Sequence, residues 1–158
     1  MTAQTSKTDD YTIYFYRAKE EPYGCFSNFS PHIFELDGAL WPTSEHYFQA
    51  QKFIGTTHAE EIRRARSAKQ AAEMGRQRVR PLRTDWEEVK DGVMRRAVLK
   101  KFEAHSDIRE ILLATADKLI VEDSPTDYYW GVGGDRSGQN KLGQILMEVR
   151  EILRSRVK

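Results

Sequence analysis

Apolar residues recur at helical spacing along two long segments of the chain. In the first segment, one helical stripe consists of Trp86, Val89, Val93, Ala97 and Phe102. Thr84 and Glu87 have the spacing of a capping box, which predicts that this helix begins beside them. In the second segment, about residues 140–155, apolar side chains again share one face: Leu142, Ile145, Leu146, Val149, Ile152 and Leu153. Both segments are therefore predicted to be helices that bury one side.

Four shorter segments also have helical character. The first covers about residues 44–54, where Thr43 or Ser44 can cap the free N–H groups of the first turn and Gly55 is expected to end the helix. The others cover about residues 57–65, 67–76 and 107–115. Helices are therefore expected to dominate the fold.

Strand signals are fewer and lie mostly near the N-terminus. Residues 11–16 (YTIYFY) are aromatic and β-branched, which is typical of a strand. Residues 33–41 (IFELDGALW) place Asp37-Gly38 between apolar flanks and predict a hairpin, and residues 119–121 (LIV) favour a brief strand. The predicted fold class is α+β: a mainly α-helical single domain with a small N-terminal antiparallel β element.

Length and composition set the expected organisation of the chain. A chain of 158 residues suffices for one buried core, which we assign to residues 11–158, with residues 1–10 as a disordered tail. This tail lacks the apolar core of a signal peptide, and no apolar run has the length of a membrane span. The single cysteine, Cys25, excludes an internal disulfide. A cytoplasmic location without membrane partners is expected.

Charge is balanced over the whole chain but uneven along it. The formal net charge is +1, which gives no global field to attract nucleic acid. Residues 61–101 nevertheless hold thirteen Lys or Arg against six Asp or Glu, a local excess of +7. This excess indicates either a surface for an anionic ligand or solvated helix faces. Four arginines of this stretch can grip phosphate oxygens: Arg76, Arg78, Arg80 and Arg83.

The predicted helix over residues 44–54 carries the strongest candidate chemistry. At helical spacing, Glu45, Gln49 and Lys52 share one face. Aromatic residues crowd around them: Trp41, Tyr47, Phe48 and Phe53. This combination of an acid, an amide and an amine beside aromatic rings indicates a catalytic pocket. The alternative interpretation is a surface helix with its Glu and Lys exposed to solvent.

Residues 124–143 form a second candidate segment. Its glycines and the helix that follows favour a loop that offers backbone N–H groups to an anion, although a flexible surface loop has the same composition. Asp127 and Trp130 can pair a carboxylate with a stacking ring, or serve as a turn residue and a core residue. Asn140 can cap the last helix. The histidines lack ligand spacing, so no metal site is expected.

Several segments together resemble a known family. They are GCFSNFSP (24–31), WPTSEHYFQAQKF (41–53), MGR (74–76), WEEVKDGVMRRA (86–97), KF (101–102), DYYWGVGG (127–134) and GQNKLGQILMEVR (138–150). Over about residues 11–153 the chain resembles the NADAR family, and within it the YbiA-like branch of N-glycosidases that act on riboflavin-biosynthesis intermediates. It departs from the pattern in the N-terminal tail and around residues 135–139.

The resemblance implies a cofactor-free catalytic domain that cleaves an N-glycosidic bond. Its substrates would be ribosylamino-pyrimidine phosphates, split into ribose 5-phosphate and an aminopyrimidine to dispose of reactive intermediates. Relatives implicated in removing ADP-ribose from guanine give the first alternative, in which nucleic acid becomes a possible partner. A non-catalytic module for ADP-ribose-like ligands is the second. The oligomeric state stays open.

The resemblance and the spacing together assign Glu45, Lys52 and Asp127 to catalysis. As one hypothesis, Lys52 forms a Schiff base with the sugar while Glu45 or Asp127 moves protons. As the rival, a carboxylate stabilises an oxocarbenium ion, water attacks directly, and Lys52 binds phosphate or ribose. In either mechanism Trp86 and Trp130 would flank the pyrimidine, and the glycine loop and an arginine would receive the phosphate. The candidate binding residues are Asn28, Phe29, Gln49, Arg76, Trp86, Trp130, Gly131, Gly133, Gly134 and Asn140.

Overall fold

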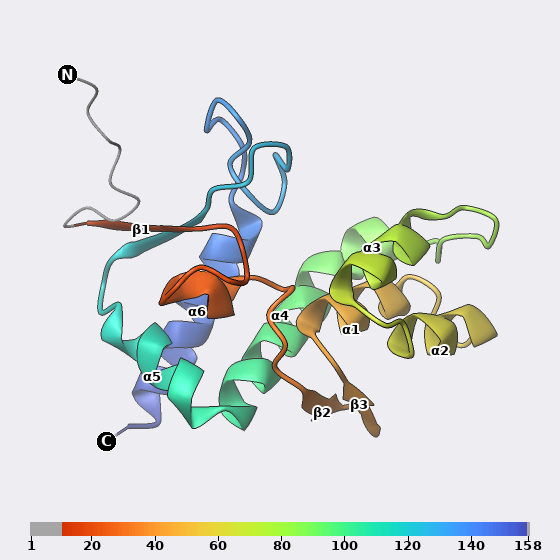
Figure 1. Cartoon of the computed structure of the whole chain (residues 1–158), viewed down its shortest axis with the longest axis horizontal. Coiled ribbons are helices and arrows are strands. Elements are labelled where there is room, and N and C mark those ends of the chain that lie inside the picture. Colours follow the sequence, from red (N-terminus) through yellow and green to blue (C-terminus); the bar gives the residue numbers. More distant parts are fainter. Residues whose placement is uncertain (1–10, 158) are drawn as a thin grey trace. The chain divides into compact units, whose positions relative to one another are not determined.

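A computed structural model describes residues 11–157 of the chain, so the predicted disordered tail over residues 1–10 lies outside the described residues (Figure 1). Contacts between Cα atoms divide the chain into two compact units. One unit joins the segment that ends at Ser27 to the segment that starts at Asp107, and the other is Asn28–Ser106. The assignment of one domain to residues 11–158 stays a prediction.

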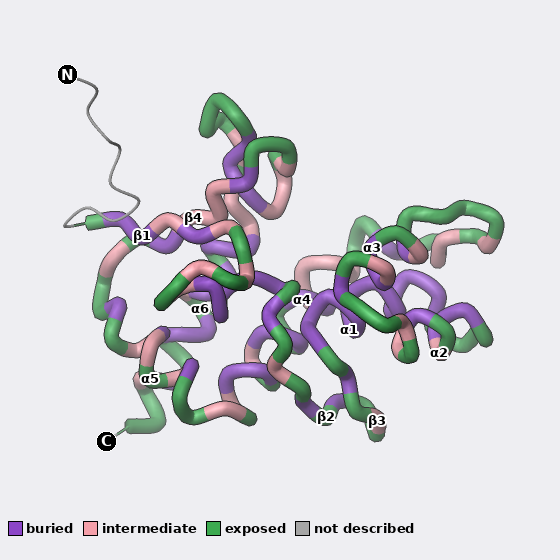
Figure 2. Tube along the Cα trace, in the orientation of Figure 1, coloured by how far each residue is buried: buried purple, intermediate pink, exposed green. Residues whose placement is uncertain are grey.

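The unit Asn28–Ser106 consists of helices and one β-hairpin. Its helices are α1 (Ser44–Gln51), α2 (Thr57–Arg63), α3 (Ala68–Arg76) and α4 (Trp86–Ala104). Helix α1 packs against the other three helices, and every one of its residues is buried (Figure 2). The helix expected over residues 44–54 is thus shorter than predicted, because residues 52–54 continue as turns. Helix α1 is the centre of this unit.

The predicted hairpin is confirmed. Strands β2 (Phe34–Leu36) and β3 (Ala39–Trp41) pair antiparallel, and both turn residues, Asp37 and Gly38, have positive φ angles of 55° and 77°. Such angles give the turn the twist that a two-residue hairpin needs. The hydroxyl of Tyr47 on α1 donates to the Asp37 carboxylate at 2.6 Å, which fastens the hairpin to the central helix.

Helix α4 has the predicted apolar stripe but not the predicted cap. Trp86, Val93 and other apolar positions of the stripe are buried. The helix begins one residue later than a Thr84 cap would place it, with Asp85 at the N-cap and no side-chain capping bond. The carboxylate of Asp85 is held instead by Arg83, with Nε–Oδ1 at 2.6 Å. The prediction of a capping box is therefore wrong.

The other unit combines a two-stranded sheet with two helices and a short 3-10 helix. Strands β1 (Thr12–Phe15) and β4 (Leu119–Glu122) pair in parallel, with Ile13 opposite Ile120. The 3-10 helix η1 (Tyr23–Phe26) follows β1, and the helices are α5 (Ser106–Ala114) and α6 (Lys141–Ser155). The α+β class is confirmed, and the parallel pair is an addition to the predicted antiparallel element. Among residues 11–157, no helix has both the length and the hydropathy for crossing a membrane.

Helix α6 is fastened to β4 by Asn140 rather than capped by it. Asn140 has a left-handed backbone (φ 54°) and makes no side-chain capping bond, so the predicted cap is wrong. Its side-chain amide accepts from the N–H of Glu122 at 2.9 Å and donates to the carbonyl of Ile120 at 3.0 Å. A Cβ atom on Gly143 would lie 2.1 Å from that same carbonyl, so glycine is needed for this close contact.

Candidate active site

The start of helix α1 is fixed by hydrogen bonds on both sides of Thr43. The Thr43 hydroxyl accepts from the N–H of His46 at 3.1 Å, as expected of an N-cap. It also contacts Nδ1 of His46 at 2.8 Å, while Nε2 of that ring lies 3.0 Å from the carbonyl of Ala65. The carbonyl of Ala65 can only accept, so Nε2 carries a proton, and in a neutral ring Nδ1 accepts from the Thr43 hydroxyl. Burial lowers the pKa of His46, which favours the same neutral form.

Asn28 also contacts this end of the helix. Its side-chain oxygen accepts from the Ser44 hydroxyl at 2.9 Å, and its carbonyl accepts from the N–H of Glu45 at 3.2 Å. Its amide nitrogen lies 3.4 Å from the sulfur of Met94. Asn28 therefore positions Glu45 at the first turn, and its predicted contact with substrate stays a prediction.

Glu45 and Gln49 form a buried pair along one face of α1. Gln49 Nε2 donates to Glu45 Oε2 at 2.7 Å, and the two residues are only 8% and 6% exposed. A charge-assisted hydrogen bond of this kind holds the carboxylate in one orientation. The prediction that Glu45 and Gln49 share one helical face is therefore confirmed.

Gly75 on α3 makes room for the Gln49 side chain. A Cβ atom at Gly75 would lie 1.9 Å from Oε1 and 2.9 Å from Cβ of Gln49, so α1 and α3 approach more closely there than any side chain allows. Oε1 of Gln49 is buried and has no hydrogen-bond partner among the described residues. In the sequence Gly75 belongs to the MGR motif near the end of a predicted helix, and nothing in the local sequence shows which residue lies opposite it.

Lys52 follows the last turn of α1 and is buried beside two aromatic rings. It is 8% exposed, and its Nζ lies 5.8 Å from the ring centroids of both Phe48 and Trp86. The two rings meet edge to face at 5.0 Å. Nζ donates to the carbonyl of Gly75 at 3.4 Å. An amine in these surroundings has lost most of its hydration, which disfavours the charged form.

The pKa of Lys52 is lowered to about 8. Burial is the largest cause, and the positive charges of Arg78, Arg76 and Lys90 act in the same direction, while the negative charge of Glu45 raises the pKa. At pH 7 roughly a tenth of an amine with this pKa is neutral, whereas an ordinary lysine is almost fully charged. Lys52 therefore combines burial with the partial deprotonation that a nucleophilic amine requires.

The acid, the amide and the amine thus lie along one buried face, as the helical spacing predicted. Trp86, predicted to flank the pyrimidine, is 5% exposed and packs its ring against Phe48, whereas Phe29 is 43% exposed. The catalytic roles of Glu45 and Lys52, and the binding roles of Trp86 and Phe29, stay predictions. The alternative of a solvated surface helix is wrong for α1.

Asp127 and Trp130 belong to the other unit. Oδ1 of Asp127 accepts the N–H groups of Tyr129 at 2.9 Å and of Trp130 at 2.8 Å, and its own N–H donates to the Ser124 hydroxyl. These contacts are those of a turn residue. The predicted meeting of Asp127 and Trp130 with Glu45 and Lys52 stays a prediction.

Loop carbonyls occupy the first N–H groups of helix α6. The amide of Lys141 donates to the carbonyl of Tyr129 and the amide of Leu142 to that of Trp130, each at 3.0 Å. The sequence offered these amides as an anion site, and they already have partners. Gly133 has a φ angle of 74°, and a Cβ there would lie 2.2 Å from the Tyr128 ring. Packing thus explains this glycine, and the binding roles of Gly131, Gly133, Gly134 and Asn140 stay predictions.

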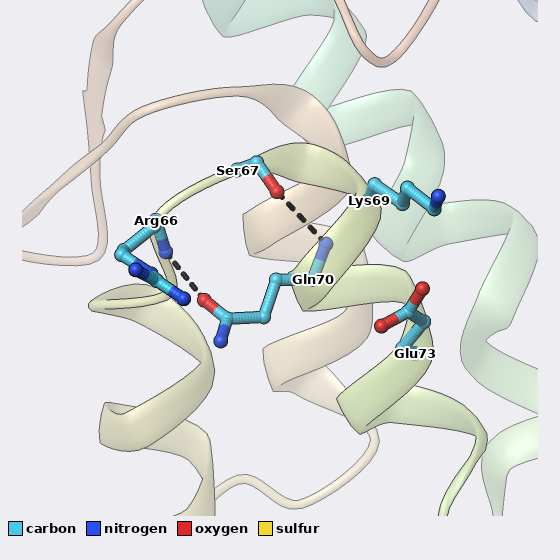
Figure 3. A pocket seen from close by; sticks show the side chains of 5 residues that line it. All are labelled: Arg66, Ser67, Lys69, Gln70 and Glu73. Carbon is cyan, nitrogen blue, oxygen red and sulfur yellow. Dashed lines mark hydrogen bonds between the residues drawn. The ribbon is translucent and has the colours of Figure 1, made fainter.

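A polar pocket of about 490 Å³ lies at the start of α3 (Figure 3). Its lining residues are Arg66, Ser67, Lys69, Gln70 and Glu73. The Ser67 hydroxyl accepts from the N–H of Gln70 and so caps the helix. The Gln70 side chain accepts from the N–H of Arg66, the residue before this cap. None of these residues was predicted for the site.

Among residues 11–157, no group of three or more His, Cys, Asp or Glu could hold a metal ion.

Comparisons with known proteins show the family of the chain. The model of the NADAR domain matches residues 14–154. The chain belongs to the NADAR family. The N-glycosidase YbiA of Escherichia coli is 53% identical over 144 residues, which cover 91% of this chain and 89% of YbiA. The NMR structure of YbiA superimposes with a TM-score of 0.86 at 51% identity, covering 94% of this chain and 88% of that one.

Two other relatives extend the comparison. An N-glycosidase of Nostoc punctiforme is 53% identical over 147 residues, covering 91% of this chain and 94% of the relative. The chloroplastic riboflavin biosynthesis protein PYRR of Zea mays is 43% identical over 147 residues, covering 83% of this chain and 24% of PYRR. The curated names and the extent of the alignments place this NADAR protein among the N-glycosidases.

Replacing Gly75 by alanine is expected to displace Gln49 and break its hydrogen bond to Glu45. Overpacking of this kind destabilises a domain by about 1–3 kcal/mol. Gly92 on α4 is the matched control, because a Cβ there meets nothing within 4 Å. Gly92→Ala is expected to be neutral or to stabilise by about 0.5–1 kcal/mol through helix propensity. Urea unfolding measures both, and equal effects of the two variants would contradict the steric role of Gly75.

The surroundings of Lys52 predict opposite pKa shifts for two variants. Lys52 is expected to titrate near pH 8 in the unmodified protein. Glu45→Gln removes a charge that raises this pKa and is expected to lower it, whereas Arg78→Gln is expected to raise it, each by about 0.5–1 pH unit. NMR titration of the lysine Cε resonances, assigned with Lys52→Met, measures the midpoints. A midpoint near the ordinary lysine value, or shifts in the same direction, would refute this account of the site.

Proposed function

We propose that this NADAR protein hydrolyses the C–N bond between ribose 5-phosphate and the exocyclic amine of early riboflavin-biosynthesis intermediates, which are ribosylamino-pyrimidine phosphates. The observation that carries the proposal is the buried Lys52 amine with a pKa of about 8, on the same helix face as the Glu45–Gln49 pair. The riboflavin biosynthesis name of the maize relative supports this substrate class. The cytoplasmic location expected from the sequence belongs to the same proposal.

In the proposed chemistry the Lys52 amine attacks C1 of the sugar, which is at the oxidation level of an aldehyde. A sugar joined to an exocyclic amine opens to an imine at C1, and the neutral Lys52 amine adds to that carbon. The aminopyrimidine then leaves with a proton, so that Lys52 is joined to the sugar as a new imine. Water adds to this imine and releases ribose 5-phosphate with its aldehyde, which restores the lysine amine. One water molecule is consumed in each cycle.

Glu45 is the group placed to move protons during these steps. Its carboxylate is buried, oriented by Gln49, and close enough to Lys52 to influence the charge of the amine. A carboxylate in this position can protonate the departing aminopyrimidine and later activate water. Asp127 of the other unit is the second candidate for this role.

Direct attack by water is the rival mechanism. In this route a carboxylate stabilises the oxocarbenium ion, and Lys52 only binds the sugar or its phosphate. The lowered pKa of Lys52 favours the covalent route, because a lysine that only binds an anion is most effective when it is fully charged.

Incubation with a ribosylamino-pyrimidine phosphate is expected to release free aminopyrimidine and ribose 5-phosphate, detected by chromatography and mass spectrometry. ADP-ribosylated guanosine is assayed in parallel, because it also has ribose on an exocyclic amine. Glu45→Gln is expected to lower turnover by about 100-fold or more, as loss of a general acid–base group does, while ribose 5-phosphate still binds. Release of guanosine alone would favour the glycohydrolase alternative. Binding of these ligands without release of either base would favour a non-catalytic module.

Borohydride added during turnover is expected to trap the sugar on Lys52. Reduction of the imine leaves a stable secondary amine, so the peptide that contains Lys52 gains the mass of the reduced sugar phosphate. Lys52→Gln is expected to give no adduct, and Lys69→Gln, which changes a lysine on α3, is the control that keeps it. Turnover without an adduct on Lys52 would instead establish the direct route.

A further inference from the structure

Four arginines follow one another at the end of α3 and in the segment beyond it: Arg76, Arg78, Arg80 and Arg83. The sequence presents them as equivalent candidates for binding phosphate. The structure separates them, because each guanidinium has different partners. Two of them have their charge paired with a carboxylate of the same unit, and two do not.

Arg83 is held by an acidic partner and by the end of α1. Its Nε and Nη2 lie 2.6 and 3.0 Å from the two carboxylate oxygens of Asp85, which is the bidentate geometry of a strong pair. Its Nη1 donates to the carbonyl of Gln51, and its backbone N–H donates to the carbonyl of Lys52 at 3.1 Å. Arg83 therefore holds Lys52 in place through the backbone.

Arg80 is also paired within the unit. Its guanidinium lies 3.3 Å from the Glu61 carboxylate and contacts Nδ1 of His58. Nε2 of His58 lies 3.3 Å from the carbonyl of Met74, so this ring accepts from Arg80 and donates to the end of α3. Arg80 thus fastens its segment to α2, and His58 joins α2 to α3.

Arg78 has no carboxylate partner among residues 11–157. Its Nη1 donates to the carbonyl of Gly75 at 2.8 Å and to that of Gln77 at 3.1 Å. The same Gly75 carbonyl accepts from Nζ of Lys52 at 3.4 Å, so one neutral oxygen joins the two cations. Arg76 is exposed and also makes no ion pair with a described residue. Their charges act together on Lys52, and the Glu45 carboxylate opposes them.

We propose that Arg78, assisted by Arg76, binds the phosphate of the substrate beside the Lys52 amine. This assignment rests on the proposed function and names the arginine that recognises the phosphate. Both hydrogen bonds of Arg78 to backbone carbonyls are made by Nη1. The edge formed by Nε and Nη2 can therefore donate two hydrogen bonds to two phosphate oxygens. The positive charges of Arg76, Arg78 and Lys52 repel one another, and an anion bound between them reduces this repulsion.

Binding of the phosphate has a consequence for the neighbouring amine. In the free protein the charge of Arg78 contributes to lowering the pKa of Lys52. A bound dianion opposes that effect, so the pKa of Lys52 is higher in the complex than in the free protein. The pH profile of kcat, which reports the complex, is therefore expected to rise at higher pH than the profile of kcat/KM.

The test compares phosphorylated ribosylamino-pyrimidine with its dephosphorylated counterpart in the unmodified protein, Arg78→Gln and Arg66→Gln. Arg66 is an exposed arginine of the same unit and is not among the charges that act on Lys52. Arg78→Gln is expected to reduce the preference in kcat/KM for the phosphorylated substrate by about 10- to 100-fold, as loss of a charge-assisted hydrogen bond does. Arg66→Gln is expected to keep the preference. An unchanged preference in Arg78→Gln would overturn the assignment.

Titration with ribose 5-phosphate and with ribose separates this inference from the proposed function. NMR shifts at the Gly75 amide are expected to saturate with ribose 5-phosphate at lower concentration than with ribose, and Arg78→Gln is expected to remove the difference. If no substrate is hydrolysed but this pattern holds, the proposed function fails and the phosphate subsite stands. If ribose 5-phosphate binds equally well to the Arg78→Gln variant, or does not bind to the unmodified protein, the subsite is refuted.

Discussion

The close contact between α1 and α3 at Gly75 is the constraint on which the candidate site depends. The absence of a side chain leaves space for Gln49, whose amide orients the Glu45 carboxylate. The carbonyl of the same glycine accepts from the Lys52 amine. One backbone position therefore fixes both the acid and the amine, and a larger residue would disturb them together.

Burial and nearby charges change the pKa of Lys52 by different amounts. Removal from water is the largest cause of its lowered pKa, and the nearby arginines and the Glu45 carboxylate modify the result in opposite directions. The rings of Phe48 and Trp86 lie beside this amine, each with its centroid 5.8 Å from Nζ, and both residues also belong to the core. Burial of this kind favours the neutral form of an amine.

Local patterns in the sequence predicted those features of the structure that depend on residues close together in the chain. The shared face of Glu45, Gln49 and Lys52 follows from the helical period, and the hairpin follows from the backbone freedom of Asp37-Gly38. Long-range partners were not predictable: Asp85 bonds Arg83 in place of the expected cap, and Asn140 bonds β4. The same limit applies to the arginines, since only the fold shows which of them have acidic neighbours.

The parallel pairing of β1 with β4 has a consequence for the order of assembly. The residues from Asn28 to Ser106 form a continuous stretch, so they can acquire their core as soon as they leave the ribosome. Strand β1 is synthesised earlier, yet its partner β4 emerges about a hundred residues later. The nascent chain therefore carries an unmatched strand edge for most of its synthesis, and completion of this sheet is a late, non-local event.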